Sequence, residues 1–110
     1  LSLFCDYRVM AEGPFRIGLN EVQVGLFVPD SIQYALKRLV GAHRAERLMV
    51  AGAMIESAEA HRVGMVDELA AVADVVPRAL AFCRGLVALP PLAMAATRRI
   101  ARADLHAVLD

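Results

Sequence analysis

The order of sequence patterns predicts an α/β fold, with strands and a helix in the first third and helices throughout the remainder. Two observations carry this prediction. Two short strand patterns, 6–11 and 15–19, flank a turn at Gly13 and Pro14. From residue 30 onward, apolar residues recur at the 3.6-residue period of amphipathic helices. An α/β layer followed by a helical appendage fits this order.

The N-terminal third contains the two short strands and one irregular segment. Residues 1–5 are typical of the end of a helix that enters the first strand. The segment 20–29 has weak periodicity and contains Gly25, so we expect a loop or an irregular half-turn there. This segment separates the strands from the helices that follow.

The helices predicted after residue 30 have recognisable starts and stops. Asp30 or Ser31 caps the first one, and Gly41 ends it. Pro90 and Pro91 break one helix and start the next. The predicted helices span 30–40, 43–52, 57–64, 74–88 and 91–109, and 65–69 is a strand or an extended exit. The apolar faces expected to point inward are Ile32, Ala35, Leu36, Leu39 and Val40 in the helix 30–40 and Ala45, Leu48 and Met49 in the helix 43–52. The expected apolar face of the helix 74–88 consists of Val76, Ala79, Leu80, Cys83 and Val87.

The composition limits the classes of protein and of partner. Hydrophobic residues make up 58% of the chain, above the roughly 45–50% of typical globular proteins. We expect the surplus apolar surface to meet another part of the protein or another subunit. The charge-free apolar runs, such as LMVAGAMI, are short, which argues against a membrane span. The net charge is zero, which argues against a nucleic-acid partner.

The cysteines and histidines do not follow a metal-binding pattern. Cys5 and Cys83 lie far apart and outside any CxxC motif, so we expect free, buried thiols in a reduced, cytoplasmic protein. His43, His61 and His106 are scattered without the spacing of zinc ligands. The sequence therefore predicts no metal site.

The beginning of the chain suggests a longer polypeptide. It starts with Leu1 rather than Met, and LSLFCDYRV is typical of a helix tail with no start signal before it. No signal-peptide pattern is visible, although a missing N-terminus would hide one. We therefore expect the 110 residues to be part of a larger protein.

The stretch GLNEVQVGLFVP, residues 18–29, contains a single acid among apolar and small neutral residues. A charged carboxylate is costly to bury unless it is paired or protonated. Glu21 is therefore either an exposed residue on a loop at a strand end, which composition alone favours, or a functional group.

Two stretches resemble the crotonase superfamily, the enoyl-CoA hydratases and isomerases. CDYRVMAEGPFRIGLNEVQVGL, residues 5–26, is similar to the family's Cys-Asp-x-Arg strand, short turn and strand ending in Glu, followed by Gly-Leu and a Pro. LVGAHRAERLMVAGAMIESAEAHRVGMVDEL, residues 39–69, is similar to the following family segment. The matching positions in the first stretch and just after it are Cys5, Asp6, Arg8, Glu21, Gly25, Leu26 and Pro29.

The resemblance implies a crotonase-like spiral of ββα units. Residues 1–70 would form the C-terminal part of this spiral core, and 71–110 a C-terminal helical segment. The helices of that segment pack on the body or on a neighbouring subunit, and members are typically homotrimers or dimers of trimers. The match corresponds to about the C-terminal half of a member, so the segments that supply the oxyanion-hole amides are expected upstream of Leu1.

The resemblance also implies chemistry on an acyl-CoA thioester. Two backbone N–H groups stabilise the enolate, and a carboxylate moves protons at carbons next to the carbonyl. Glu21 matches the catalytic Glu of the family. Asn20 is expected to orient the loop, and Phe27, Val28 and Pro29 to line the acyl pocket or pack beneath it. CoA enters as part of the substrate, and no further cofactor is implied.

The choice between family reactions depends on the residues around Glu21. GLFVPDSIQYAL lacks the Gly-Gly that hydratases commonly carry, and GLN stands where many hydratases have Pro. IGLNEVQVGL is more similar to the mitochondrial type of Δ3,Δ2-enoyl-CoA isomerase. We therefore expect an isomerase. The alternatives are a hydratase, whose second Glu would lie just before Leu1, and a non-catalytic crotonase-like module.

Several charged residues have structural and functional interpretations. Asp6 and Arg8 match the family strand, and we expect a structural ion pair or a helix-end contact. Arg98, Arg99 and Arg102 lie near one face of the last helix. We expect that face to be solvated, and binding of CoA phosphates is the alternative.

Overall fold

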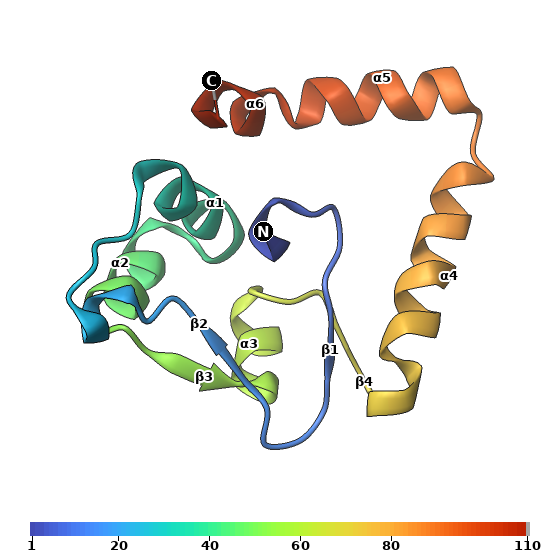
Figure 1. Cartoon of the computed structure of the whole chain (residues 1–110). Helices are drawn as coiled ribbons and strands as arrows, with labels where there is room; N and C mark the ends of the chain where they lie inside the picture. The colour runs from blue at the N-terminus through green and yellow to red at the C-terminus, as the bar shows by residue number, and fades with distance from the viewer. Residues whose placement is uncertain (110) are drawn as a thin grey trace.

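The computed structural model describes residues 1–109 of the chain. A main body of short strands and helices is followed by two helices, Val75–Val87 and Pro91–Ala101, that extend from it, and a last helix, Ala103–Leu109, returns the chain to the body at the C-terminal end (Figure 1). The elements, with η for a 3-10 helix, are η1 (Ser2–Phe4), β1 (Val9–Ala11), β2 (Arg16–Gly18), η2 (Glu21–Val24), α1 (Asp30–Val40), α2 (Ala42–Ala51), β3 (Met54–Glu56), α3 (Ser57–Val63), β4 (Glu68–Ala70), η3 (Val72–Asp74), α4 (Val75–Val87), α5 (Pro91–Ala101) and α6 (Ala103–Leu109).

The four strands form two small ladders. β1 pairs in parallel with β4, with Met10 opposite Leu69, and β2 pairs antiparallel with β3, with Ile17 opposite Ile55. The chain between β1 and β4 therefore crosses over through β2, β3 and three helices. The sequence does not predict β3, because three residues are too few to show the alternation of a strand. Its pairing with β2 defines it.

The hydrophobic core lies among α1, α2 and α3. Leu36 of α1 is 1% exposed, and Ala45 of α2 and Ala60 of α3 are 0% exposed. Alanine at these two positions lets each helix backbone lie close to its neighbours. The inward faces predicted for the helices 30–40 and 43–52 are confirmed. The buried cluster consists of Val28, Leu36, Val40, Ala45, Met49, Ala60, Val63, Met65 and Val66.

The helix α4 turns a different face to the body than the sequence predicts. Val76, Leu80 and Val87 are 65%, 47% and 73% exposed, so the predicted apolar face is wrong. A helix that contacts the body along one narrow strip buries little side-chain surface. The apolar pattern alone does not indicate which side of such a helix is the buried one. The half-buried positions are Val75, Ala79, Phe82 and Leu86.

The cysteines are free, as predicted, but they are not buried. Cys5 and Cys83 are both exposed. Cys83 lies on the outward side of α4, beside Phe82, whose ring stacks on Tyr7 with 4.0 Å between ring centroids. The expectation of buried thiols is wrong, because Cys5 follows η1 at the surface and Cys83 lies on a face of α4 that does not contact the body.

The last predicted helix, 91–109, is two helices. α5 ends at Arg102, whose backbone lies at φ −107° and ψ 14°, and α6 follows in a new direction. The turn buries Leu105, which is 4% exposed. It also lets Asp104 accept hydrogen bonds from Tyr34 Oη at 2.7 Å and Arg38 Nε at 2.9 Å. No glycine or proline marks this break, so the sequence does not reveal it.

Arginine side chains join α5 to the N-terminal turn. Arg98 donates from Nε and Nη2 to the Asp6 carboxylate at 2.5 and 2.7 Å, and Arg102 donates to the carbonyl of Phe4. Arg8 is 9% exposed, and its Nη1 donates to the carbonyls of Ser2 and Cys5, at the beginning and just after the end of η1. The structural roles predicted for Asp6 and Arg8 are confirmed. Asp6 forms an ion pair with Arg98, while Arg8 contacts η1 and lies 3.4 Å from the Asp67 carboxylate.

The two extending helices meet at a sharp bend. The segments Val72–Val87 and Pro91–Ala101 are inclined by 112° (Figure 1). Within residues 1–109, no single helix has the length and hydropathy needed to cross a bilayer, and this bent pair reaches that length only when both segments are taken together.

Candidate active site

Glu21 stands at the first position of η2, just after β2. Gly18 at the end of β2 lies so close to β3 that a Cβ atom there would be 2.1 Å from the carbonyl oxygen of Ala53. After Glu21, Gly25 ends η2 at φ 79°, a left-handed conformation that glycine adopts without strain. The Leu26 amide donates to the Glu21 carbonyl at 3.0 Å and closes the turn. Two glycines thus fix where the segment with Glu21 begins and ends.

The carboxylate of Glu21 is partly enclosed and lacks a partner. Its Oε2 atom is buried, and no hydrogen-bond donor within residues 1–109 reaches it. Buried polar atoms in native proteins are nearly always hydrogen-bonded, so an unpartnered carboxylate oxygen calls for an explanation in function or in a missing neighbour. Such an oxygen is free to accept a proton from a bound molecule.

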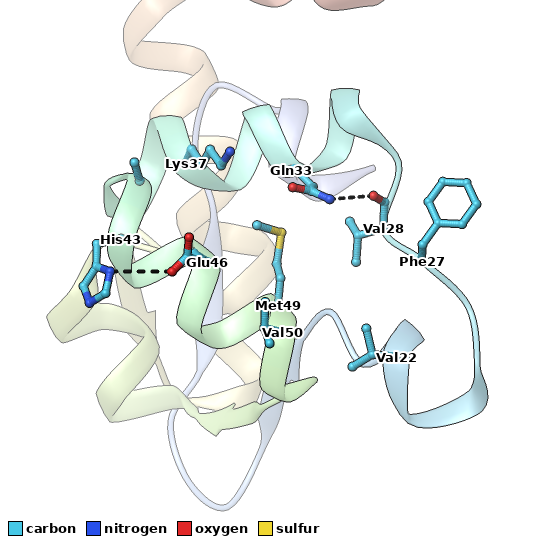
Figure 2. Close-up of a pocket in the computed structure, with 10 residues that line it drawn as sticks. Val22, Phe27, Val28, Gln33, Lys37, His43, Glu46, Met49 and Val50 are labelled. Atoms are coloured by element: carbon cyan, nitrogen blue, oxygen red, sulfur yellow. Dashed lines mark hydrogen bonds and ion pairs between the residues drawn. The ribbon is translucent and has the colours of Figure 1, made fainter.

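A pocket of about 470 Å³ opens beside this segment, between η2, α1 and α2 (Figure 2). More than half of its lining residues are apolar, and the polar side chains of His43 and Glu46 lie exposed at its mouth. Glu21 does not line it, although the next residue, Val22, does. The lining residues are Val22, Phe27, Val28, Gln33, Lys37, Ala42, His43, Glu46, Met49 and Val50.

The predicted substrate-binding residues occupy different positions around this pocket. Val28 is 4% exposed and packs into the core, while Phe27 is 81% exposed, with its ring directed away from the other lining side chains (Figure 2). Pro29 forms the N-cap of α1. Asn20 is exposed, and its backbone carbonyl, not its side chain, joins the turn by accepting from the Gln23 amide at 3.0 Å. The structure brings Phe27 and Val28 together at one pocket and leaves Asn20 and Pro29 outside its lining.

The polar lining of the pocket is not predicted from the sequence. Gln33 and Lys37 lie four residues apart on α1 and therefore share a face. The side-chain amide of Gln33 donates from Nε2 to the Val28 carbonyl at 2.8 Å, and this bond holds the loop that enters α1 (Figure 2). At the mouth, His43 Nδ1 lies 3.8 Å from Glu46 Oε2. The i, i+4 spacing was the available signal, but it also describes any solvated helix face.

The carboxylates with perturbed pKa values lie away from this pocket. The hydrogen bond from Arg98 is the main cause that lowers the pKa of Asp6. Hydrogen bonds from Tyr34 and then Arg38 lower the pKa of Asp104. Both groups belong to the contacts that join α5 and α6 to the body. Hydrogen bonds from Arg62 and from Arg78 likewise lower the pKa values of Glu59 and Glu68, so all four carboxylates report structural ion pairs. Within residues 1–109, no three His, Cys, Asp or Glu side chains are grouped closely enough to hold a metal ion.

A comparison with known protein families establishes the family of this chain. The sequence model described as enoyl-CoA hydratase/isomerase matches residues 1–110, the entire chain. This chain belongs to the enoyl-CoA hydratase/isomerase family. The predicted family and the predicted partial crotonase-like fold are both confirmed.

Relatives with curated names include both activities. The chain is 35% identical over 103 residues to the human protein named enoyl-CoA delta isomerase 1, mitochondrial. The matched residues make up 93% of this chain and 34% of the relative. It is 32% identical over 98 residues to a probable enoyl-CoA hydratase of Mycobacterium tuberculosis, covering 89% of this chain and 37% of the relative. The chain thus spans about a third of the length of these relatives.

Solved structures agree with this family. The crystal structure of human mitochondrial delta3-delta2-enoyl-CoA isomerase superposes with a TM-score of 0.77 at 33% identity, over 96% of this chain and 46% of that one. An enoyl-CoA hydratase/isomerase family protein of Pseudomonas syringae gives a TM-score of 0.87 at 28% identity, over 99% of this chain and 48% of that one. The crotonase architecture of residues 1–109 is therefore shared with experimentally determined members of the family.

Proposed function

We propose that this family member isomerises Δ3-enoyl-CoA to Δ2-enoyl-CoA and that Glu21 is its acid/base. The observation that carries this proposal is the buried Oε2 atom of Glu21, which has no hydrogen-bond donor within residues 1–109. A carboxylate oxygen without a protein partner is available to take a proton from carbon and to return it. The isomerase named among the relatives supports the same reaction.

The reaction requires one proton to move between two carbons. Glu21 takes a proton from C2 of the 3-enoyl thioester, and the electron pair of the broken C–H bond delocalises into a dienolate. Glu21 then returns the proton to C4, and the double bond moves from C3–C4 to C2–C3. No water, metal or redox partner is consumed, so one carboxylate suffices. The amides that would stabilise the enolate oxygen are expected outside these 110 residues.

The acyl group is proposed to lie near the pocket beside η2. Phe27 and Val28 line this pocket, as do Met49 and Val50. These apolar side chains suit the carbon chain of a thioester, while Asn20 and Pro29 are proposed to contact the substrate or shape the loop around it. The substrate is proposed to bring CoA with it, and the proposal requires no separate cofactor.

Hydration of a 2-enoyl-CoA is the second candidate function. The observation that favours it is the 32% identity to the probable hydratase of Mycobacterium tuberculosis. Hydration needs a second acid/base group that holds the water. GLFVPD, without the Gly-Gly of many hydratases, favours the isomerase instead.

We also propose assembly into a homotrimer or a dimer of trimers in the cytoplasm. Large apolar side chains remain exposed in the single chain, which supports burial against another surface. Sedimentation equilibrium of the protein expressed from its complete gene tests the assembly. The most exposed of these side chains are Leu1, Val24, Phe27, Val50, Val87, Leu92 and Ile100.

The test is turnover in heavy water by the protein expressed from its complete gene. With a 3-enoyl-CoA, double-bond migration with deuterium incorporation and no added water supports the isomerase. Net addition of water to a 2-enoyl-CoA supports the hydratase instead. No reaction and no exchange with either would overturn both proposals and favour a non-catalytic module.

The variant Glu21→Gln tests the proposed residue. It keeps the shape of the side chain and removes its ability to take a proton, so kcat should fall by at least about 10²-fold, the lower end of what general acid–base catalysis contributes. Acyl-CoA binding measured by calorimetry should stay nearly unchanged. Full retained turnover would remove Glu21 from the mechanism.

A further inference from the structure

The segment that carries Glu21 has little to hold its orientation. η2 contains only four residues, none of them buried, and no side chain caps its N-terminus. Its backbone hydrogen bonds, such as Gln23 N to Asn20 O and Leu26 N to Glu21 O, are all local. Short 3-10 helices have poorer hydrogen-bond geometry than α-helices. An outside contact is therefore needed to keep the Glu21 carboxylate in one place.

One side chain of η2 makes such a contact. The Nε2 atom of Gln23 donates a hydrogen bond to the carbonyl oxygen of Gly52 at 2.6 Å, across 29 positions of sequence. Gly52 is the C-cap of α2, where backbone carbonyls lack partners within the helix and accept readily. The bond thus attaches the turn that carries Glu21 to the end of a core helix.

The glycine at this contact allows the close approach. Gly52 is buried and lies at φ 61°. A Cβ atom there would lie 2.9 Å from both Gln23 Cγ and Val22 Cγ2, closer than real Cβ contacts. Only glycine combines this left-handed backbone with room for the two side chains that directly follow Glu21.

We propose that Gln23 is a positioning residue that holds the Glu21 carboxylate at the reacting carbons by fastening η2 to Gly52. This inference rests on the proposed role of Glu21. A 3-10 helix has three residues per turn, so side chains two positions apart point in directions about 120° apart. Gln23 therefore reaches α2 while Glu21 faces elsewhere, and Gln23 acts through the backbone rather than on the substrate. Displacing a catalytic group by about 1 Å can cost about 10² in rate.

The test compares two variants, one of the same length as glutamine and one longer by a single atom, in the protein expressed from its complete gene. Gln23→Met removes the donor and keeps the length of the side chain, while Gln23→Lys keeps a donor at the end. With a 3-enoyl-CoA substrate, we expect kcat to fall about tenfold in Gln23→Met with KM within about twofold. Gln23→Lys should recover most of kcat. Gln23→Asn, one methylene shorter, should behave like Gln23→Met. It replaces Gln23→Met in the test if that variant does not fold.

A matched control separates positioning from simple loss of stability. Ser57 is 2% exposed, and its Oγ donates to the Gly13 carbonyl at 3.0 Å, a long-range bond of the same kind at the far end of the β2–β3 pair. Ser57→Ala should lower the melting temperature and leave kcat unchanged. If Gln23→Met leaves kcat within about twofold, or if Ser57→Ala lowers kcat equally, the positioning role is refuted.

The outcome for Glu21→Gln distinguishes the two proposals. If Glu21→Gln abolishes turnover and Gln23→Met does not affect it, only the positioning role fails. If Glu21→Gln keeps full turnover, the proposed function of Glu21 fails, whatever Gln23→Met does.

Discussion

Substituting Gly18 tests how closely the end of β2 must approach β3. A Cβ atom at this position would lie 2.1 Å from the Ala53 carbonyl oxygen and 3.1 Å from Met54 Cα, while ordinary contacts begin near 3.4 Å. In Gly18→Ala, one of the two backbones must therefore move by more than about 1 Å. Ala53 is held because its amide donates to the Leu48 carbonyl at 3.0 Å, so we expect β2 to yield.

This displacement should affect both stability and catalysis. Overpacking typically costs about 1–3 kcal/mol of unfolding free energy, and we expect Gly18→Ala to reach the upper end because the obstacle is backbone. Glu21 follows Gly18 by three residues, so its carboxylate moves with β2. A shift of about 1 Å should lower kcat about 10²-fold.

Urea unfolding and steady-state turnover measure the two effects, and Gly85→Ala is the control. Gly85 lies within α4, and a Cβ atom there would meet nothing within 4 Å. Alanine at this position should raise the unfolding free energy by about 0.5–1 kcal/mol. A Gly18→Ala protein within about 0.5 kcal/mol of the parent, with unchanged kcat, would refute the close β2–β3 approach.

Two further predictions concern the core and the contact of α5 with the N-terminal turn. Leu36→Ala should lower the unfolding free energy by about 2–5 kcal/mol, because a 1% exposed side chain leaves a cavity. His61→Ala, at an exposed position of α3, is its control in urea, and equal effects would contradict the assigned core. The hydrogen bond from Arg98 lowers the pKa of Asp6 in the folded protein. The contact therefore stabilises the fold fully above about pH 4, the usual pKa of an Asp side chain. Its contribution to the unfolding free energy is lost as the pH falls through the lower pKa of the folded state. The difference in unfolding free energy between the parent and Asp6→Asn should therefore shrink below about pH 4. A difference that stays constant down to about pH 3 would contradict a stabilising contact between Arg98 and the ionised Asp6 carboxylate.

Local signals in the sequence predicted much of the fold. Gly41 and the pair Pro90–Pro91 mark helix boundaries that the structure reproduces at Val40 and at Pro91. Glycine and proline act through their own backbone, so their effect does not depend on distant contacts. The apolar period of the helices 30–40 and 43–52 correctly placed their faces, because both are packed against the core on one side.

The failures share a different cause. The face of α4, the break at Arg102 and the strand β3 each depend on which distant segment lies alongside. α6 turns because Leu105 can be buried and Asp104 can reach Tyr34 on α1, 70 positions away. A local pattern contains no information on such partners.

The candidate site divides in the same way. The sequence by itself determined the family and singled out Glu21, because a lone acid in a specific motif is a local property. Only the tertiary structure gave its Oε2 atom a buried position without a donor in residues 1–109, and only it brought Gln23 to the carbonyl of Gly52. These features depend on contacts between segments far apart in the chain, and such contacts form only when the core of α1, α2 and α3 packs and brings those segments together.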